Sequence, residues 1–464
     1  MTIVSTTKAH LQAVLKGSPL DPELLNKAID QLKLDKSLFV KDNAPDNTVI
    51  VELLPLAIEI LKTPVAGDVT LITDLIQALL AHTSFEDVVH FISTDQLLAG
   101  LDSGVPALQN VCVAQIAKAS PADLVANTPL VDKLLELFAD KDNQAVQSVQ
   151  DTLVHLASNG ELVVRRIFGS PQLSNMKNSD DAVLQSRLMA LLESVLKLEY
   201  PVDSNLLVFD DKVFDPTSPS WDVLQTVSVV QFYRTIIENP HLPTLVKTIV
   251  GPLEAITKMF SQRNEFEDVK MFLLSEIYML FRGLSYKEYD LFKSLDDRFN
   301  IVNSSLADRE ERISALTFIN PRYIFEFKNS VIADVRIMSA ELPILRNLVT
   351  YEPSFTQLGL NQQNLLNLVY GDMLILLLVV IRTPFGLKKL LHEWPQVMTA
   401  IINKENVREP EIFNLRREVL EFLYNKPAAT LGAWYGGVKE AYKEVILGAG
   451  YGQEVQAIVA DKAA

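Results

Sequence analysis

The chain has 464 residues, of which 48% are hydrophobic, and it carries a formal net charge of −16. A chain of this length can bury a large core, but a single compact core stops growing at about 250–300 residues, so several domains or an elongated stack of repeats is expected. The negative charge argues against a nucleic-acid backbone as the main partner, since phosphates attract Lys and Arg and repel carboxylates.

Apolar residues recur at the 3.6-residue spacing of amphipathic helices along nearly the whole chain. In chain order, the clearest stripes are Ile72, Leu75, Ile76 and Leu79; Val105, Leu108, Val111 and Cys112; Val146, Val149, Leu153 and Leu156; and Val183, Leu184, Leu188, Leu191, Leu192 and Val195. Short breaks typical of helix stops and starts separate them, at residues 63–67, 120–121, 140–143, 158–160 and 170–171. No convincing alternating strand is present, so an all-α fold is predicted.

The spacing of the helices distinguishes a bundle from a solenoid. Starting points near residues 47, 84, 129 and 159 are each followed by a second long helix, which is a repeat of roughly 30–45 residues. A single bundle of so many helices would need a very wide core, whereas stacked helix pairs bury one continuous seam. We therefore predict a HEAT/armadillo-like helical repeat solenoid.

Two features divide the chain. Residues 200–220 are acidic and contain three prolines, which predicts a loop or insertion between an N-terminal arm (1–199) and a C-terminal arm (221–447), followed by a fraying tail (448–464). Residues 1–240 hold 31 Asp and Glu against 17 Lys and Arg, a net charge of −14, whereas the remainder holds 27 against 25, a net of −2. This asymmetry favours association with a basic surface, with solubility alone as the alternative.

The sequence contains no recognisable catalytic or metal-binding motif. Gly-x-Gly-x-x-Gly, P-loop and Gly-x-Ser-x-Gly patterns are absent. His82 and His90 flank Glu86 and Asp87, but their eight-residue separation across a turn is not ligand spacing, and polar surface residues are the simpler interpretation. We expect no enzymatic activity, no cofactor and no metal.

The same survey predicts where the chain resides. Residues 1–20 lack the basic start and apolar core of a signal peptide. The longest apolar run, Met373 to Ile381, is much shorter than the ~20 residues that span a bilayer. The sequence contains a single cysteine, Cys112, which excludes internal disulfides and cysteine-based zinc sites. Because Cys112 lies on an apolar helix face, we predict that it is a core residue. We expect a soluble monomer of the cytoplasm, with the nucleus as a further location.

What remains is a surface. In the second helix of each N-terminal pair, polar residues recur at spacings of three and four on the face opposite the apolar stripe. If these helices line the inner curve of a solenoid, they form a polar, acidic ridge suited to a folded domain or an extended peptide. Ordinary solvated faces are the alternative for any single residue. The predicted partner-binding residues are Asp74, Gln77, Asn110, Ser148, Asp151, His155, Gln185 and Glu193.

Several segments, in order from about residue 80 to 445, carry a likeness to a known family. They are Ser84–Val88, Ser93–Leu97, Glu161–Phe168, Glu288–Lys293, Ile319–Tyr323, Leu345–Leu348, Leu390–Met398 and Trp434-Tyr435. Through them the chain resembles the fungal HEAT-repeat chaperone that assists assembly of the base of the 26S proteasome regulatory particle. That family is the counterpart of the animal proteasome non-ATPase regulatory subunit 5, and it has also been described as a DNA mismatch-repair protein.

The resemblance implies a C-shaped superhelix whose concave side grips the small C-terminal domain of one AAA ATPase subunit, the first of six. It also implies a base precursor that contains a second ATPase and a non-ATPase subunit, and a role in preventing premature docking on the core particle. The family's contact residues do not form a transferable motif, so the ridge residues above rest on helical phase alone.

Two other functions stay open. An armadillo-type adaptor for a basic peptide would line its groove with Trp and Asn, but Trp221, Trp394 and Trp434 lie outside the ridge. An accessory DNA mismatch-repair role would need a basic stripe. Lys388-Lys389 and Arg416-Arg417 are the only small basic clusters of the C-terminal arm, and solvated helix faces are the simpler explanation for them.

Overall fold

The computed structural model describes residues 2–41, 44–62, 69–179, 181–198, 203–239, 243–302, 309–403 and 409–448. Within these ranges the regular secondary structure is helical, apart from one antiparallel pair of two-residue strands, β1 (Val40–Lys41) and β2 (Ala44–Pro45). The chain divides into two compact units, Met1–Leu253 and Glu254–Ala464. The predicted all-α repeat fold is confirmed.

The first unit consists of short and medium helices joined by tight turns. Its α-helices are α1 (Ile3–Val14), α2 (Pro22–Leu34), α3 (Thr48–Lys62), α4 (Val69–Leu80), α5 (Phe85–Phe91), α6 (Thr94–Leu101), α7 (Pro106–Ile116), α8 (Asp123–Ala126), α9 (Leu130–Ala139), α10 (Val146–Asn159), α11 (Glu161–Phe168), α12 (Pro171–Lys177), α13 (Ala182–Leu196), α14 (Val223–Glu238) and α15 (Pro243–Val246). Its 3₁₀ turns are η1 (Lys36–Phe39), η2 (Ser204–Leu206) and η3 (Asp211–Phe214). The four apolar stripes predicted from the sequence fall on α4, α7, α10 and α13.

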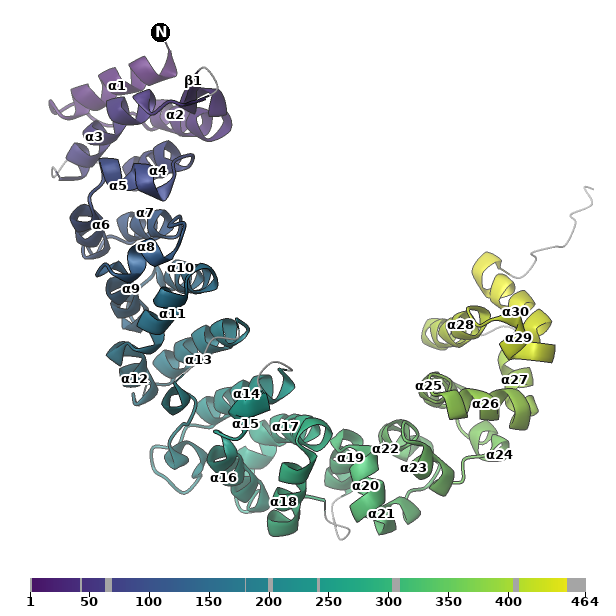
Figure 1. The fold of residues 1–464 in the computed structure, drawn as a ribbon. Coiled ribbons are helices and arrows are strands. Elements are labelled where there is room, and N and C mark those ends of the chain that lie inside the picture. The colour runs from purple at the N-terminus through teal and green to yellow at the C-terminus, as the bar shows by residue number, and fades with distance from the viewer. Residues whose placement is uncertain are drawn as a thin grey trace, which may run out of the picture. The chain divides into compact units, whose positions relative to one another are not determined.

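Two rows of helices are stacked along the first unit (Figure 1). In one row α2 packs on α4, and α7, α10, α13 and α14 follow as successive neighbours. In the other row α1 packs on α3, and α6, α9 and α12 also follow one another. The rows are joined by pairs such as α3 with α4, α6 with α7 and α9 with α10. This is the layered stacking that a HEAT-like repeat requires.

The buried residues of the apolar stripes fill the seam between the two rows, whereas Val105 and Val183, which are also predicted as stripe residues, are exposed. In α13, Leu188, Leu191, Leu192 and Val195 are all fully buried. The Asp181 carboxylate accepts the Val183 N–H at 2.9 Å, which caps the start of the helix. Burial of one Leu or Val side chain contributes about 1.5–3 kcal/mol, whereas a cap contributes about 1 kcal/mol. Packing therefore holds the helix in place, and the cap sets where it begins.

Long polar side chains form hydrogen bonds between successive repeats. Lys118, just after α7, donates to the carbonyl of Leu80 at the end of α4, and burial lowers the pKa of its ammonium to about 8. Arg187 of α13 donates to the carbonyls of Phe138, Asp140 and Lys141 at 3.3, 2.7 and 3.0 Å, where α9 ends. The last carbonyls of a helix have no hydrogen-bond partner within that helix. The side chains of Lys118 and Arg187 supply the missing donors at the ends of α4 and α9.

The acidic segment predicted as a loop or insertion, residues 200–220, has no α-helix in its described part, residues 203–220. Buried apolar side chains anchor it, among them Leu207, Phe209 and Phe214. The hydroxyl of Tyr233 on α14 donates to the carbonyl of Leu207 at 3.1 Å and accepts the N–H of Phe209 at 3.2 Å. The segment belongs to the first unit, and the two units divide later, after Leu253.

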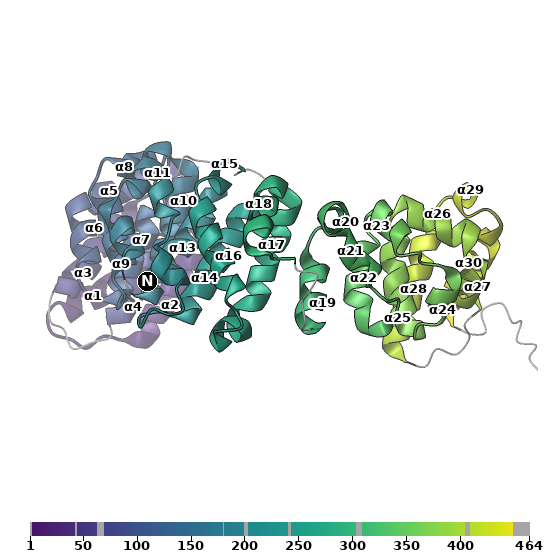
Figure 2. The same ribbon diagram turned by 90° about the horizontal axis from the view of Figure 1, so that it is seen from below.

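The second unit follows α16 (Val250–Ser261), a helix that spans the division. Its elements are the π-helical turn η4 (Val269–Leu273), α17 (Leu274–Lys287), α18 (Tyr289–Phe299), α19 (Arg309–Phe318), α20 (Pro321–Phe327), α21 (Asn329–Ala333), η5 (Ser339–Glu341), α22 (Leu342–Leu348), α23 (Glu352–Gln357), α24 (Gln362–Leu366), α25 (Tyr370–Val380), α26 (Pro384–Glu393), α27 (Pro395–Ile402), α28 (Pro410–Tyr424), α29 (Ala428–Leu431), η6 (Gly432–Trp434) and α30 (Tyr435–Leu447). Helices α17, α19, α22, α25, α28 and α30 are successive neighbours, so this unit also contains a continuous row (Figure 1, Figure 2).

The apolar run Met373–Ile381 forms most of α25, whose side chains lie in the core of the second unit. In the described part of the chain no helix is both long and apolar enough to cross a membrane. The tail predicted to fray, residues 448–464, lies outside the described residues except for Gly448. The C shape implied by the family resemblance stays a prediction.

Candidate protein-binding surface

The row of α4, α7, α10 and α13 leaves one face of each helix open to solvent. Helix α7, for example, is flanked by α4 and α10 and packs on α6. On its remaining face Asn110 is exposed, and Ala107 and Ala114 are partly exposed. We call these open faces together the row surface. Of the eight residues predicted from helical phase, seven have side chains that reach it: Asp74 and Gln77 on α4, Asn110 on α7, Ser148, Asp151 and His155 on α10, and Glu193 on α13. Asp74 and Glu193 are half-buried, and the other five are exposed.

The row surface is polar but carries few long side chains at its centre. On α7, Asn110 stands among Ala107, Ala114 and the following Ala117, all of which are partly exposed. On α10, the amide of Gln147 donates to the carboxylate of Asp151 at 2.9 Å, which holds that charge on the open face. Small side chains allow a partner's backbone or helix to approach closely, while the carboxylates supply negative charge.

Glu193 lies where α13 meets α14. Burial raises the pKa of its carboxyl, while a hydrogen bond from Thr235 and the nearby charges of Lys197 and Arg234 act in the opposite direction. Because the folded-state pKa is raised, ionisation of Glu193 opposes folding, and this contribution disappears as pH falls through the raised value. A cationic partner group at this point would offset the cost of desolvating the carboxylate.

The prediction that Gln185 lies on the same open face is wrong. Gln185 is only 5% exposed, and its amide donates to the carbonyls of Lys177 and Ser179 at 2.9 and 2.8 Å, where α12 ends. Its own oxygen accepts a hydrogen bond from the amide of Gln225 on α14. Gln185 therefore caps the C-terminal end of α12 and links α12, α13 and α14. Its polar groups are not available to a partner.

We expect Gln185→Ala to destabilise the first unit by about 1–2 kcal/mol, because two carbonyls and the Gln225 amide would lose their buried partner. Ser186→Ala, one residue further on the exposed side of α13, should change stability by less than about 0.5 kcal/mol. Urea unfolding followed by circular dichroism compares the two variants. Equal effects would contradict the structural role assigned to Gln185.

The same kind of contact recurs elsewhere and corrects a second expectation. Gln109, like Gln185, is the fourth residue of its helix, and it donates to the carbonyl of Leu101 at the end of α6 at 2.9 Å. Arg416 of α28 is 5% exposed and donates to the carbonyls of Ile401 and Ile402 at 2.8 Å each, where α27 ends. The explanation of Arg416 as part of a solvated basic face is therefore wrong.

Two features of the described residues concern the groups that could support chemistry. Within them no group of three or more His, Cys, Asp and Glu side chains is arranged to hold a metal ion. Cys112 is 5% exposed, as predicted for a core residue, and burial raises the pKa of its thiol to about 12. At neutral pH it is a protonated thiol and a poor nucleophile.

Two family models match the chain. One described as "DNA mismatch repair protein HSM3, N terminal domain" matches residues 8–238, and one described as "DNA mismatch repair protein HSM3, C terminal domain" matches residues 243–464. Curated proteins with the name "DNA mismatch repair protein HSM3" are similar along most of their length. The Kluyveromyces lactis protein is 26% identical over 97% of each chain, the Eremothecium gossypii protein 25% over 91%, and the Saccharomyces cerevisiae protein 23% over 84%.

Proposed function

The chain belongs to the HSM3 family, and from this premise we propose that it is an assembly chaperone of the 26S proteasome regulatory-particle base. In this proposal the row surface of the first unit binds the C-terminal domain of one AAA ATPase subunit, the first of six. Binding holds that subunit in a precursor with a second ATPase and a non-ATPase subunit and prevents premature docking on the core particle. The chain acts by binding alone, without catalysis, as a monomer in the cytoplasm.

The observation that carries the proposal is the continuous row of α4, α7, α10 and α13, whose open faces present polar and acidic side chains. A surface of this kind suits a folded domain with a basic face better than it suits a small molecule. The net charge of −14 over residues 1–240 would speed the encounter with such a domain and make it sensitive to salt. The identity of the domain comes from the family resemblance.

DNA mismatch repair is a second candidate function, because the similar fungal proteins are named for it. Some of the basic side chains that could contact phosphates are engaged within the protein. Arg416 is buried against backbone carbonyls, and the ammonium of Lys389 lies 2.5 Å from the carboxylate of Glu393. In the first unit Arg166 is paired with Asp132. We therefore favour the protein partner, and duplex DNA that binds tightly at low salt would reverse this preference.

An adaptor for an extended basic peptide is the third candidate. The row surface has a single Asn, Asn110, among the seven residues named above, and no Trp. A peptide array of Lys- and Arg-rich sequences separates this function from the binding of a folded domain. Strong binding to linear peptides would favour the adaptor.

Affinity purification from cells, followed by mass spectrometry, tests the proposed function. We expect recovery of base ATPase subunits together with a non-ATPase subunit of the base, without core-particle subunits. Recovery of mismatch-repair proteins without base ATPases would reject the chaperone function in favour of the second candidate.

A further inference from the structure

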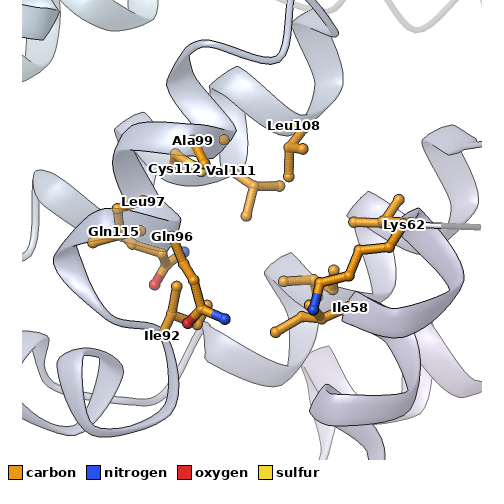
Figure 3. Close-up of a pocket in the computed structure, with 13 residues that line it drawn as sticks. Ile58, Lys62, Ile92, Gln96, Leu97, Ala99, Leu108, Val111, Cys112 and Gln115 are labelled. Atoms are coloured by element: carbon orange, nitrogen blue, oxygen red, sulfur yellow. The ribbon is translucent and has the colours of Figure 1, made fainter.

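The first unit contains an apolar pocket of about 210 Å³ between α3, α4, the end of α5, α6 and α7. Figure 3 shows Ile58 and Lys62 on one wall, with Gln115, Leu97 and Ile92 across from them and Leu108 above. None of the eight residues predicted for partner binding lines it. The pocket is therefore separate from the row surface.

The pocket exists because α3 and α6 do not close on each other. Helix α3 packs on α1 and α4, and α6 packs on α7 and α9, which leaves a gap in this row between the two. Gly100 on α6 lets that helix approach α7 closely, since a Cβ at this position would lie 2.4 Å from the sulfur of Cys112. Close contact between α6 and α7 thus forms the floor of the pocket, and the space on the side of α3 stays open.

One polar group in the pocket wall lacks a partner. Gln115 is 1% exposed, and its side-chain oxygen Oε1 is buried without a hydrogen bond. Leaving a buried acceptor unpaired is costly. Most of the wall is apolar, and the lining side chains that carry donors, Lys62, Gln96 and Cys112, make no hydrogen bond to this oxygen. A ligand with one N–H or O–H group would supply the missing donor.

We propose that this pocket binds a compact aromatic ring that carries a single hydrogen-bond donor, of the indole or phenol type, with the donor directed to the Gln115 amide. An apolar cavity of ~150 Å³ is large enough to bind benzene, so this somewhat larger pocket accommodates a bicyclic ring. Lys62 and Gln96 are exposed at the rim, where the pocket opens to solvent as far as the described residues define it. The ring can come from a free small molecule or from a tryptophan side chain of a peptide.

Titration of the full chain with indole, followed by ligand-observed NMR, tests the proposal. Gln115→Met removes the acceptor while keeping the side-chain size, and it should weaken indole binding by about three- to tenfold, the effect of one neutral hydrogen bond. Indene, which has the same shape without the N–H, should bind the Gln115→Met variant at least as well as the unmodified chain. An indole-to-indene ratio that the substitution leaves unchanged would rule out a role for Gln115.

A second pair of variants tests the location. Leu108→Trp fills the pocket from its half-buried lining position and should abolish binding of both probes. Leu162→Trp on α11, an exposed leucine outside the pocket, is the matched control and should bind indole normally. N-acetyltryptophan amide distinguishes the sources: binding as tight as that of indole indicates a peptide side chain, and much weaker binding indicates a free molecule. If indole does not bind the unmodified chain, or binds the Leu108→Trp variant equally well, the proposal is wrong.

Discussion

Asp296→Ala is expected to destabilise the second unit by about 3–5 kcal/mol, because it removes one member of a buried, charged hydrogen-bond group and leaves the others unpaired. Asp296 lies on α18 and is 1% exposed. Its carboxylate accepts the N–H of Val302 at 2.7 Å and the hydroxyl of Tyr323 at 2.7 Å, and it lies 3.1 Å from the ammonium of Lys328.

These contacts join α18 to the residues that directly follow it and to α20, which lies further along the chain. Val302 follows α18 after Asn300, whose backbone is left-handed with φ of 52°, and Tyr323 is a fully buried residue of α20. Burial and the hydrogen bond to Asp296 raise the pKa of the Tyr323 hydroxyl, so it remains a donor throughout the neutral range. Loss of the carboxylate would leave the Val302 N–H and the Tyr323 hydroxyl without an acceptor and the partly buried Lys328 ammonium without a counter-charge.

Urea unfolding checks this prediction in a Trp221→Phe background, where Trp394 and Trp434 report the second unit alone. The control is Asp297→Ala, the adjacent residue, whose carboxylate is 57% exposed and pairs with Lys293. An exposed pair of this kind contributes about 0.2–1 kcal/mol. The account of the second unit is wrong if the two variants unfold at the same urea concentration.

The combined charge reversal Asp74→Lys, Asp151→Lys and Glu193→Lys is expected to weaken binding to the ATPase domain by roughly 100-fold at low salt. Each reversal on a partly exposed surface should cost up to about 1 kcal/mol, and about 1.4 kcal/mol corresponds to a tenfold change in Kd. The effect should shrink at higher ionic strength, because exposed charges are screened.

A second triple variant serves as the matched control for this experiment. Glu52→Lys, Glu59→Lys and Glu136→Lys reverse three exposed or half-buried carboxylates on α3 and α9, in the other row of the first unit. Both triple variants change the net charge equally, so a general charge effect would weaken binding equally in both. Isothermal titration calorimetry measures the Kd values, and circular dichroism confirms that each variant is folded. Equal Kd values would show that the row surface is not the binding site.

Helical periodicity was sufficient to predict the elements and their stacking. The stripes on α4, α7, α10 and α13 are long and regular, and burial of large apolar side chains dominates the placement of such helices. The helical phase that places each apolar stripe in the core also determines which residues lie on the opposite face. Asn110 and Asp151 are exposed there, and Asp74 is half-buried.

Polar side chains that bind the ends of neighbouring helices are harder to predict. Gln185 and Arg416 are buried because their long side chains reach the last carbonyls of a preceding helix, and periodicity does not indicate which carbonyls lie nearby. A usable signal exists in hindsight, since Gln109 and Gln185 both occupy the fourth position of a second helix. The apolar pocket depends on a gap between α3 and α6, which belong to successive repeats and are separated by more than 30 residues in the sequence, so no local sequence feature indicates it.

Size-exclusion chromatography with light scattering tests the central claim most directly. The full chain is mixed at low salt with the isolated C-terminal domain of the first AAA ATPase subunit of the base. We predict a stable one-to-one complex that dissociates as the salt concentration rises. Separate elution of the two proteins at low salt would contradict the account.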